Sequence, residues 1–261
     1  SSAASDVYKR QVYGNPAAEE IQLNEETVSA GSPYKNYNPE AKGALATIRQ
    51  LIFAGRYPEA QELAGEKILS KNGFGMPYQT VGSLRLDFPG HENYINFRRE
   101  LDLEKAVATT AYTVNGVDYK REVFTSFVDQ LVIVRLTASQ PGKLTFSASL
   151  TCPQKVDVTV SGKNALILEG TTKGDDFTKG AIRFRADLKL DLQSGKSVAG
   201  DTLLSVTNAN SATIYIAMAT NFVNYKDISG NPSERNKISM KNAGKNYARA
   251  LQAHILSLIH I

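Results

Sequence analysis

Several residue types are scarce in this sequence, and their scarcity excludes certain kinds of site. A single cysteine, Cys152, stands among 261 residues, so the chain can form neither an internal disulfide nor a zinc site built on several thiolates. Histidine is also rare, with 3 residues. The sequence contains no cluster of metal ligands, no nucleophile elbow and no phosphate-binding loop. We therefore expect no metal and no cofactor.

Long apolar runs and a strong excess of charge are lacking as well. The segment LVIVRL at 131–136 is far shorter than the roughly 20 residues that a membrane-spanning helix needs. The 30 basic and 26 acidic residues leave a net charge of +4 and are mixed along the chain, which does not indicate a nucleic-acid or membrane surface. With 42% hydrophobic residues, the sequence has the composition of a globular protein with a sizeable core.

The region from about residue 80 to residue 223 carries the patterns of β-strands. In the segment AIRFRADLKLDL at 181–192, apolar residues alternate with charged ones, which places one face in a core and the other in water. The segment LVIVRLTA is apolar on both faces and predicts a central strand. Long strands with turns and no helices between them predict a mainly β fold, a large antiparallel β-sandwich.

One hairpin can be predicted residue by residue. Asn115-Gly116 is the strongest two-residue signal for a β-hairpin. This turn would pair Val114 with Val117 and Tyr112 with Tyr119, each pair on one face of the sheet.

Two regions have helical spacing instead. Residues 38–70 predict a helical hairpin inserted near the N-terminal end of the sandwich, with Asn38 as a cap and Pro39 at the first helical position. Residues 232–255 predict a C-terminal linker helix that Gly244 interrupts.

The linker helix carries an apolar stripe made by Tyr247, Leu251 and Ile255. An apolar stripe on a helix needs a surface to pack against. We therefore expect this helix to lead toward a partner domain beyond the end of the chain.

The two ends of the chain differ in character from its middle. SSAASDVYKRQ at 1–11 and LSLIHI at 256–261 resemble translated sequencing-adaptor sequence, which, like a tag, is not expected to belong to the fold. The expected organisation is then a β-sandwich domain at 12–231 and a linker helix at 232–255.

Polar segments between these elements closely resemble the N-terminal β-domain of glycoside hydrolase family 95, the family of α-L-fucosidases and some α-L-galactosidases. The resemblance covers almost all of the chain between its two ends, in the same order. Its segments are QLNEET (22–27), AGSPYKNYNPEA (30–41), MPYQTVGSLRLDF (76–88), FRRELDL (97–103), YKREVFTSFVDQLVIVRL (119–136) and ATNFVNYKDISGNP (219–232).

The resemblance implies a super-sandwich, a helical linker and an (α/α)6 barrel in which the glutamate general acid and an Asn/Asp water-activating system perform an inverting hydrolysis. It implies fucosylated oligosaccharides as substrates of the complete enzyme, intramolecular packing on the barrel, and a secreted or periplasmic location. The chain departs from the family at Ser29, where a tryptophan is usual, and lacks the family's opening strands before the counterpart of Val12. The missing tryptophan questions one stacking surface, and the missing strands question the closure of the sandwich.

Adjacent Glu25 and Glu26, beside Asn24, raise the question of acid–base chemistry. An inverting glycosidase needs two carboxyl groups roughly 6.5–9.5 Å apart across the scissile bond, whereas neighbours in an extended segment point to opposite faces. The segment is therefore either a capped, solvated loop or part of the rim of a sugar cleft. We expect no catalytic residue within this chain.

Two further segments offer rings and amides of the kind that sugar sites use. They contain Tyr78 and Gln79, and Asn221, Phe222 and Tyr225. Each has an ordinary structural interpretation, because aromatic residues start strands and Asn makes turns. His91 has no second histidine nearby, and a loop hydrogen bond is its simpler interpretation.

Two hypotheses from different classes follow. The chain is either the non-catalytic N-terminal domain of an α-L-fucosidase-like glycoside hydrolase, expected to be inactive alone, or a stand-alone carbohydrate-binding module. The linker stripe discriminates between them, because a free module would end in a polar cap.

Overall fold

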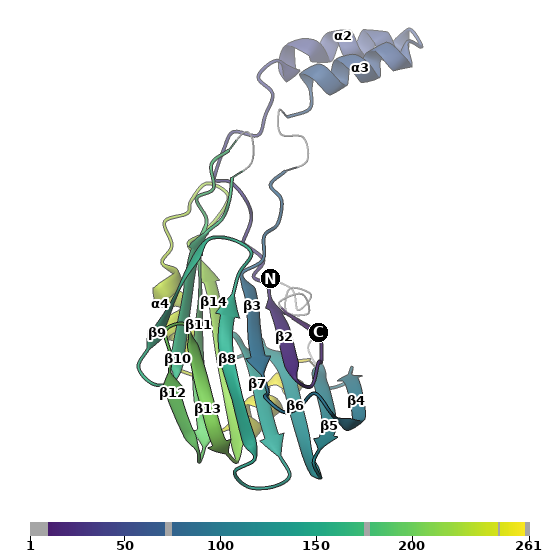
Figure 1. Cartoon of the computed structure of the whole chain (residues 1–261). Helices are drawn as coiled ribbons and strands as arrows, with labels where there is room; N and C mark the ends of the chain where they lie inside the picture. The colour runs from purple at the N-terminus through teal and green to yellow at the C-terminus, as the bar shows by residue number, and fades with distance from the viewer. Residues whose placement is uncertain (1–9, 71–74, 175–177, 245, 259–261) are drawn as a thin grey trace.

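The computed structural model describes residues 10–70, 75–174, 178–244 and 246–258. Two antiparallel β-sheets pack face to face and enclose the main core, and a helical hairpin projects from one end of the sandwich (Figure 1). The predicted mainly β sandwich with a helical hairpin is confirmed. No helix in the described ranges is long and apolar enough to span a bilayer.

The two sheets contain 6 and 8 strands. In spatial order, the six-stranded sheet consists of β1 (Arg10–Val12), β2 (Ala18–Leu23), β3 (Gly82–Asp87), β8 (Leu144–Thr151), β13 (Leu203–Ala209) and β12 (Lys196–Ala199). The eight-stranded sheet consists of β4 (Ile95–Asp102), β5 (Val107–Val114), β6 (Val117–Ser126), β7 (Leu131–Ala138), β14 (Ser211–Thr220), β11 (Arg183–Gln193), β10 (Ala165–Thr171) and β9 (Val156–Ser161).

The alternation in β11 has the predicted consequence on its inner face. Phe184, Leu188 and Leu190 are buried in the core between the sheets. The outer face is only partly in water: Arg183 is exposed, whereas Arg185 is partly covered and pairs with Asp187. The cause is a C-terminal helix that lies on this face.

The predicted hairpin between β5 and β6 is confirmed in its register. Val114 pairs with Val117 and Tyr112 with Tyr119. Both turn residues have positive φ, 49° at Asn115 and 73° at Gly116, as a type I′ turn requires. The central position of β7 is also confirmed, because it lies between β6 and β14.

The helices form two pairs. They are α2 (Ala41–Phe53), α3 (Tyr57–Lys67), α4 (Pro232–Met240) and α5 (Tyr247–Leu258).

The base of the α2–α3 hairpin differs from the prediction in one detail. α2 begins at Ala41, so Pro39 precedes the helix. The Asn38 amide closes the hairpin: its Oδ1 accepts from the Glu40 N–H at 3.0 Å, and its Nδ2 donates to the Glu66 carbonyl at 3.1 Å. Asn38 therefore ties the end of α3 to the start of α2 instead of capping α2.

The C-terminal helical region is divided in two near Gly244, whose φ is +85°. α4 starts as predicted around Pro232, and Asn231 caps it by accepting from the N–H groups of Ser233 and Glu234. Positive φ is easily adopted by glycine, so the chain turns there before α5 begins.

The expectation that the linker helix leads toward a partner domain beyond the chain stays a prediction, but two residues of its apolar stripe already pack within this chain. Tyr247 and Leu251 pack, together with buried Ala250, on a second cluster that includes Phe124 and Leu131 on the outer face of the eight-stranded sheet. Ile255 is partly buried. Tyr247 and Leu251 are thus covered by the sheet of this chain. The periodicity of the helix predicts an apolar face but not the surface that covers it.

Candidate functional site

Four polar segments come together at the end of the sandwich from which the hairpin projects (Figure 1). They follow β2, precede β3, connect β10 with β11, and follow β14. All the predicted site residues lie in the first, second and fourth of these segments: Asn24, Glu25, Glu26, Tyr78, Gln79, Asn221, Phe222 and Tyr225.

Glu25 stabilises its own turn. One carboxylate oxygen accepts from the backbone N–H of Thr27 at 2.8 Å and from its hydroxyl at 2.6 Å, and the Glu25 carbonyl accepts from the Val28 N–H at 3.1 Å. The neighbouring Glu26 is exposed. The two carboxylates therefore occupy different environments, one inside a turn and one in water.

Thr27 connects this turn to the end of β14. Its hydroxyl hydrogen-bonds the hydroxyl of Thr220, a residue that is only 1% exposed. The Thr220 hydroxyl also accepts from the Phe222 N–H at 3.2 Å. The segments around Glu25 and Phe222 are thus adjacent, although 193 positions separate the two threonines. No pattern in the sequence signals this contact.

Glu25 also lines a pocket between strand ends. The other lining residues are Thr125, Gln130, Leu131, Val132, Ile216 and Met218.

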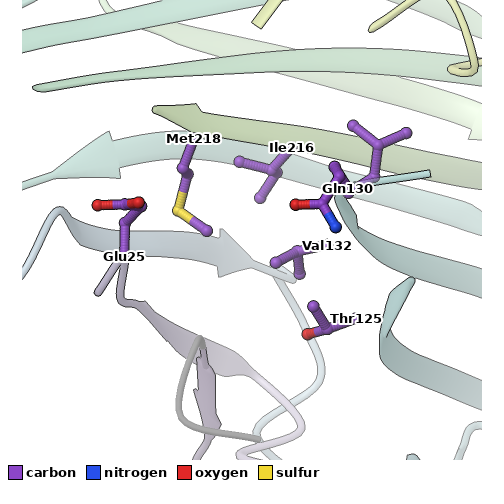
Figure 2. A pocket seen from close by; sticks show the side chains of 7 residues that line it. Glu25, Thr125, Gln130, Val132, Ile216 and Met218 are labelled. Carbon is purple, nitrogen blue, oxygen red and sulfur yellow. The ribbon is translucent and has the colours of Figure 1, made fainter. Parts of the chain in front are cut away.

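In Figure 2, Glu25 lies beside Met218 at one end of the pocket and Gln130 at the other. The cavity volume is about 20 Å³, room for about one water molecule. Small-molecule sites usually span several hundred Å³. This pocket is too small for a monosaccharide.

Tyr78 lies next to the Glu25 turn, through a β-bridge between Ser29 and Tyr78. Its side chain is half exposed, 51%. Burial of the hydroxyl raises the pKa of Tyr78 to about 12, and the Glu25 backbone and charge contribute smaller effects. At neutral pH the group is therefore a neutral hydroxyl on an accessible ring, the combination that a sugar-contacting residue needs.

The Gln79 amide is used by the fold. Its Nε2 donates to the Lys173 carbonyl at 3.2 Å, and its Oε1 accepts from the Lys173 N–H at 3.0 Å. This pair of bonds ties the segment before β3 to the connection between β10 and β11.

Asn221 is likewise a structural residue, 3% exposed. Its Oδ1 accepts from the Arg183 N–H at 2.9 Å and its Nδ2 donates to the Ala181 carbonyl at 3.2 Å. Phe222 is partly buried, and its carbonyl accepts from Arg235 at 2.7 Å.

Tyr225 differs from these residues because its side chain is 74% exposed. The Lys226 ammonium lies 5.1 Å from its ring centre. Other exposed rings at this end of the sandwich belong to Tyr78 and Phe127. Exposed apolar groups gathered at one end of a domain are typical of an interaction surface.

His91 lies on the β3–β4 connection, at the opposite end from this site, and is buried. Its Nδ1 is 2.9 Å from the Tyr112 hydroxyl, and its ring stacks on Phe88. This environment fits a hydrogen-bonding role. Among the described residues, no group of three His, Cys, Asp or Glu side chains could hold a metal ion.

Residues 11–225 match the family model described as Glycosyl hydrolase family 65, N-terminal domain. The chain is 32% identical over 234 residues to Alpha-L-fucosidase 2 of Arabidopsis thaliana, covering 81% of this chain and 27% of that protein. It is 23% identical over 231 residues to Probable alpha-fucosidase A of Aspergillus oryzae (strain ATCC 42149 / RIB 40), covering 80% of this chain and 30% of that protein.

Among solved structures, a putative kojibiose phosphorylase from human microbiome matches with a TM-score of 0.42 and 12% identity, over 98% of this chain and 39% of that chain. The chain thus spans 27% and 30% of the length of these two curated relatives.

Proposed function

Because this chain belongs to the family of glycosyl hydrolase family 65 N-terminal domains, we propose that it is the non-catalytic β-sandwich of a larger α-L-fucosidase-like enzyme of the family 95 type. The names of these two curated relatives support the fucosidase assignment, since one is named an alpha-L-fucosidase and the other a probable alpha-fucosidase. The family 95 assignment rests on the resemblance of the polar segments. In this proposal, the inverting hydrolysis belongs to a helical barrel outside the chain.

The observation that carries the proposal is the state of the carboxylates at the candidate site. Inverting hydrolysis needs an acid and a base that flank the scissile bond with room for a water between them. Glu25 is held in a turn through Thr27, and Glu26 points into solvent. The pocket beside Glu25 holds about one water. The polar end of the sandwich can border a sugar cleft, but the pocket beside Glu25 cannot enclose a sugar.

Tyr78 and Glu26 are the side chains we assign to that border. Tyr78 offers an accessible ring for stacking on a sugar face, and Glu26 offers carboxylate oxygens that accept hydrogen bonds from sugar hydroxyls. Gln79 and Asn221 hold the border in place, because their amides are bonded to backbone groups.

The test uses the complete natural enzyme. Tyr78→Ala and Glu26→Gln should raise KM for a 2'-fucosylated oligosaccharide about fivefold to tenfold and leave kcat nearly unchanged, because they remove binding common to substrate and transition state. Tyr94→Ala, an exposed tyrosine outside this end, is the matched control. A large loss of kcat in Glu26→Gln would contradict a rim role and indicate catalysis.

The isolated chain should not hydrolyse aryl α-L-fucosides. Turnover that disappears in Glu25→Gln or Glu26→Gln would overturn the non-catalytic assignment. The alternative, an independent carbohydrate-binding module, is supported by the exposed rings of Tyr78 and Tyr225. It would be favoured if calorimetry detected binding of fucosylated oligosaccharides by the isolated chain and this binding were lost in Tyr78→Ala.

A further inference from the structure

The edge strand β4 is the most exposed strand of the sandwich. Among the described strands it pairs with β5 alone, at the right-hand edge of the eight-stranded sheet in Figure 1. Its residues from Ile95 to Leu101 are all exposed. An edge strand presents backbone groups that a further strand can pair with.

The two faces of β4 have different chemistry. Leu101 pairs with Ala108 and shares a face with Arg99, which donates to the Tyr13 carbonyl at 2.7 Å and therefore points toward the six-stranded sheet. Arg98 and Glu100 lie on the outer face and form an exposed ion pair. The inner face is only partly covered, since the Leu101 side chain is 58% exposed.

Charges on an edge strand usually prevent edge-to-edge pairing, but here their order is self-complementary. When two copies of β4 pair antiparallel about Arg99, Arg98 of each copy lies opposite Glu100 of the other. Phe97, next to the register irregularity between Ile95 and Arg98, then lies nearest Leu101 of the other copy. Opposite charges and apolar residues in directly opposed positions both stabilise a strand pair. Phe97 is 44% exposed, so it is available for this contact.

Neighbouring registers are less favourable. An antiparallel pair of β4 strands keeps inner residues opposite inner residues only if the two-fold axis passes through a residue. The neighbouring registers are therefore those centred on Arg98 and on Glu100. Centring on Arg98 places Arg98 opposite Arg98 and Phe97 opposite Arg99. Centring on Glu100 places Glu100 opposite Glu100 and Arg99 opposite Leu101. The Glu100 register also places Arg98 opposite Asp102, but it brings Phe97 opposite Leu103, which lies beyond the end of β4. Within β4, only the Arg99 register combines two ion pairs with two apolar pairs.

We propose that two copies of this chain associate through antiparallel pairing of their β4 strands, centred on Arg99, to form one continuous sheet across a two-fold axis. Such an interface is isologous, because the same patch serves both partners. The two Arg99 side chains meet at the axis, and like charges there oppose association. Each Arg99 keeps its own bond to the Tyr13 carbonyl. The dimer is accordingly weak and dissociates on dilution.

Charge reversal tests the register directly. Arg98→Glu leaves two acidic residues on each copy, and Glu100→Arg leaves two basic ones, so each variant alone should dimerise at least about tenfold more weakly than the parent chain. An equimolar mixture of the two variants should dimerise, because every acidic position then faces a basic one. The double variant Arg98→Glu/Glu100→Arg should dimerise like the parent chain.

Sedimentation velocity over a concentration series measures these states. Lys237→Glu, which reverses one charge of the exposed Glu234–Lys237 pair on α4, should leave association unchanged. Recovery in the mixture also demonstrates that both single variants are folded. A parent chain that stays monomeric at the highest concentration, or single variants that associate as well as it does, would overturn the proposal.

Discussion

At the scale of single residues, the two sheets are joined by a buried ion pair between Glu19 on β2 and Arg121 on β6. Both side chains are almost completely buried. Glu19 also accepts from the Gly14 N–H at 2.7 Å, and the Arg121 guanidinium lies 4.8 Å from the centre of the Phe88 ring. Removing one partner of a buried pair generally costs about 3–5 kcal/mol, because the other charge stays buried without its partner. This pair links β2 to β6 across the core, and losing either partner should destabilise the sandwich.

His91 lies close to this pair and should make stability depend on pH. Burial, followed by the positive charge of Arg121, lowers the pKa of His91, and Glu92 raises it slightly. In the unfolded chain, His91 binds a proton near pH 6.5, whereas in the folded chain it stays neutral until the pH is lower. The free energy of unfolding should consequently fall as the pH is lowered through this range.

Urea unfolding at a series of pH values between about 5 and 7.5 measures this dependence. In His91→Gln the component due to this histidine, up to about 1.4 kcal/mol per pH unit, should be missing from the slope. Only the slopes are compared, because the substitution also removes the ring contacts with Phe88 and Tyr119. Identical slopes in the two proteins would show that His91 is protonated equally in the folded and unfolded states.

The same scale shows the limit of reading a site from residue types. Asn221 and Gln79 have the amide chemistry of sugar-binding residues, but their amides bond to backbone groups that lie 38 and 94 positions away in the sequence. Composition and spacing carry no information on such long-range partners. Tyr78 and Glu26 remain accessible, and only the fold could separate them from the others.

At the scale of elements, local patterns sufficed wherever a strand or turn depends on its own residues. The alternation in β11 and the turn at Asn115-Gly116 were predictable because side-chain period and positive φ are local properties. The position of α5 was not predictable, because it depends on the outer face of β6 and β7. That face carries Phe124 and Leu131, and the apolar character of both faces of β7 indicates a cover without telling which element supplies it.

Packing of α5 can be tested with one substitution at two positions of the same helix. Ala250 is buried against the outer face of the sheet, and Ala248 is exposed. Ala250→Asp should lower the free energy of unfolding by about 3 kcal/mol, since it places a charge in an apolar contact. Ala248→Asp should change it by less than about 0.5 kcal/mol, because the first turn of a helix favours an acidic residue.

Urea denaturation compares the two variants under the same conditions. Far-UV circular dichroism follows unfolding, because the chain contains no tryptophan. Both substitutions have the same intrinsic helix propensity cost, so a difference well beyond the roughly 0.3–1 kcal/mol that the helix N-terminus contributes at Ala248 reports burial against the sheet. Equal losses of stability would mean that α5 does not lie on the sheet in solution.

At the scale of the whole molecule, the chain consists of a sandwich with its own core and a hairpin that stands away from it (Figure 1). The C-terminal helices belong to the sandwich, since α4 and α5 cover its eight-stranded sheet. The α2–α3 hairpin buries little beyond Ile48 and Ala60, and Phe53 at its tip is 88% exposed.

Replacing residues 38–70 by a short Gly/Ser loop should therefore leave the sandwich folded. The core residues that hold the two sheets together lie in the β-strands and the segments beside them, so the deletion removes none of their contacts. We expect the melting temperature to change by less than about 4 °C, equivalent to about 1 kcal/mol for a domain of this size. Ala250→Asp, whose site lies in the sandwich, serves as a positive control that must lower the same melting curve. A fall of about 10 °C or more on deletion would mean that the hairpin folds back on the sandwich and contributes to its stability.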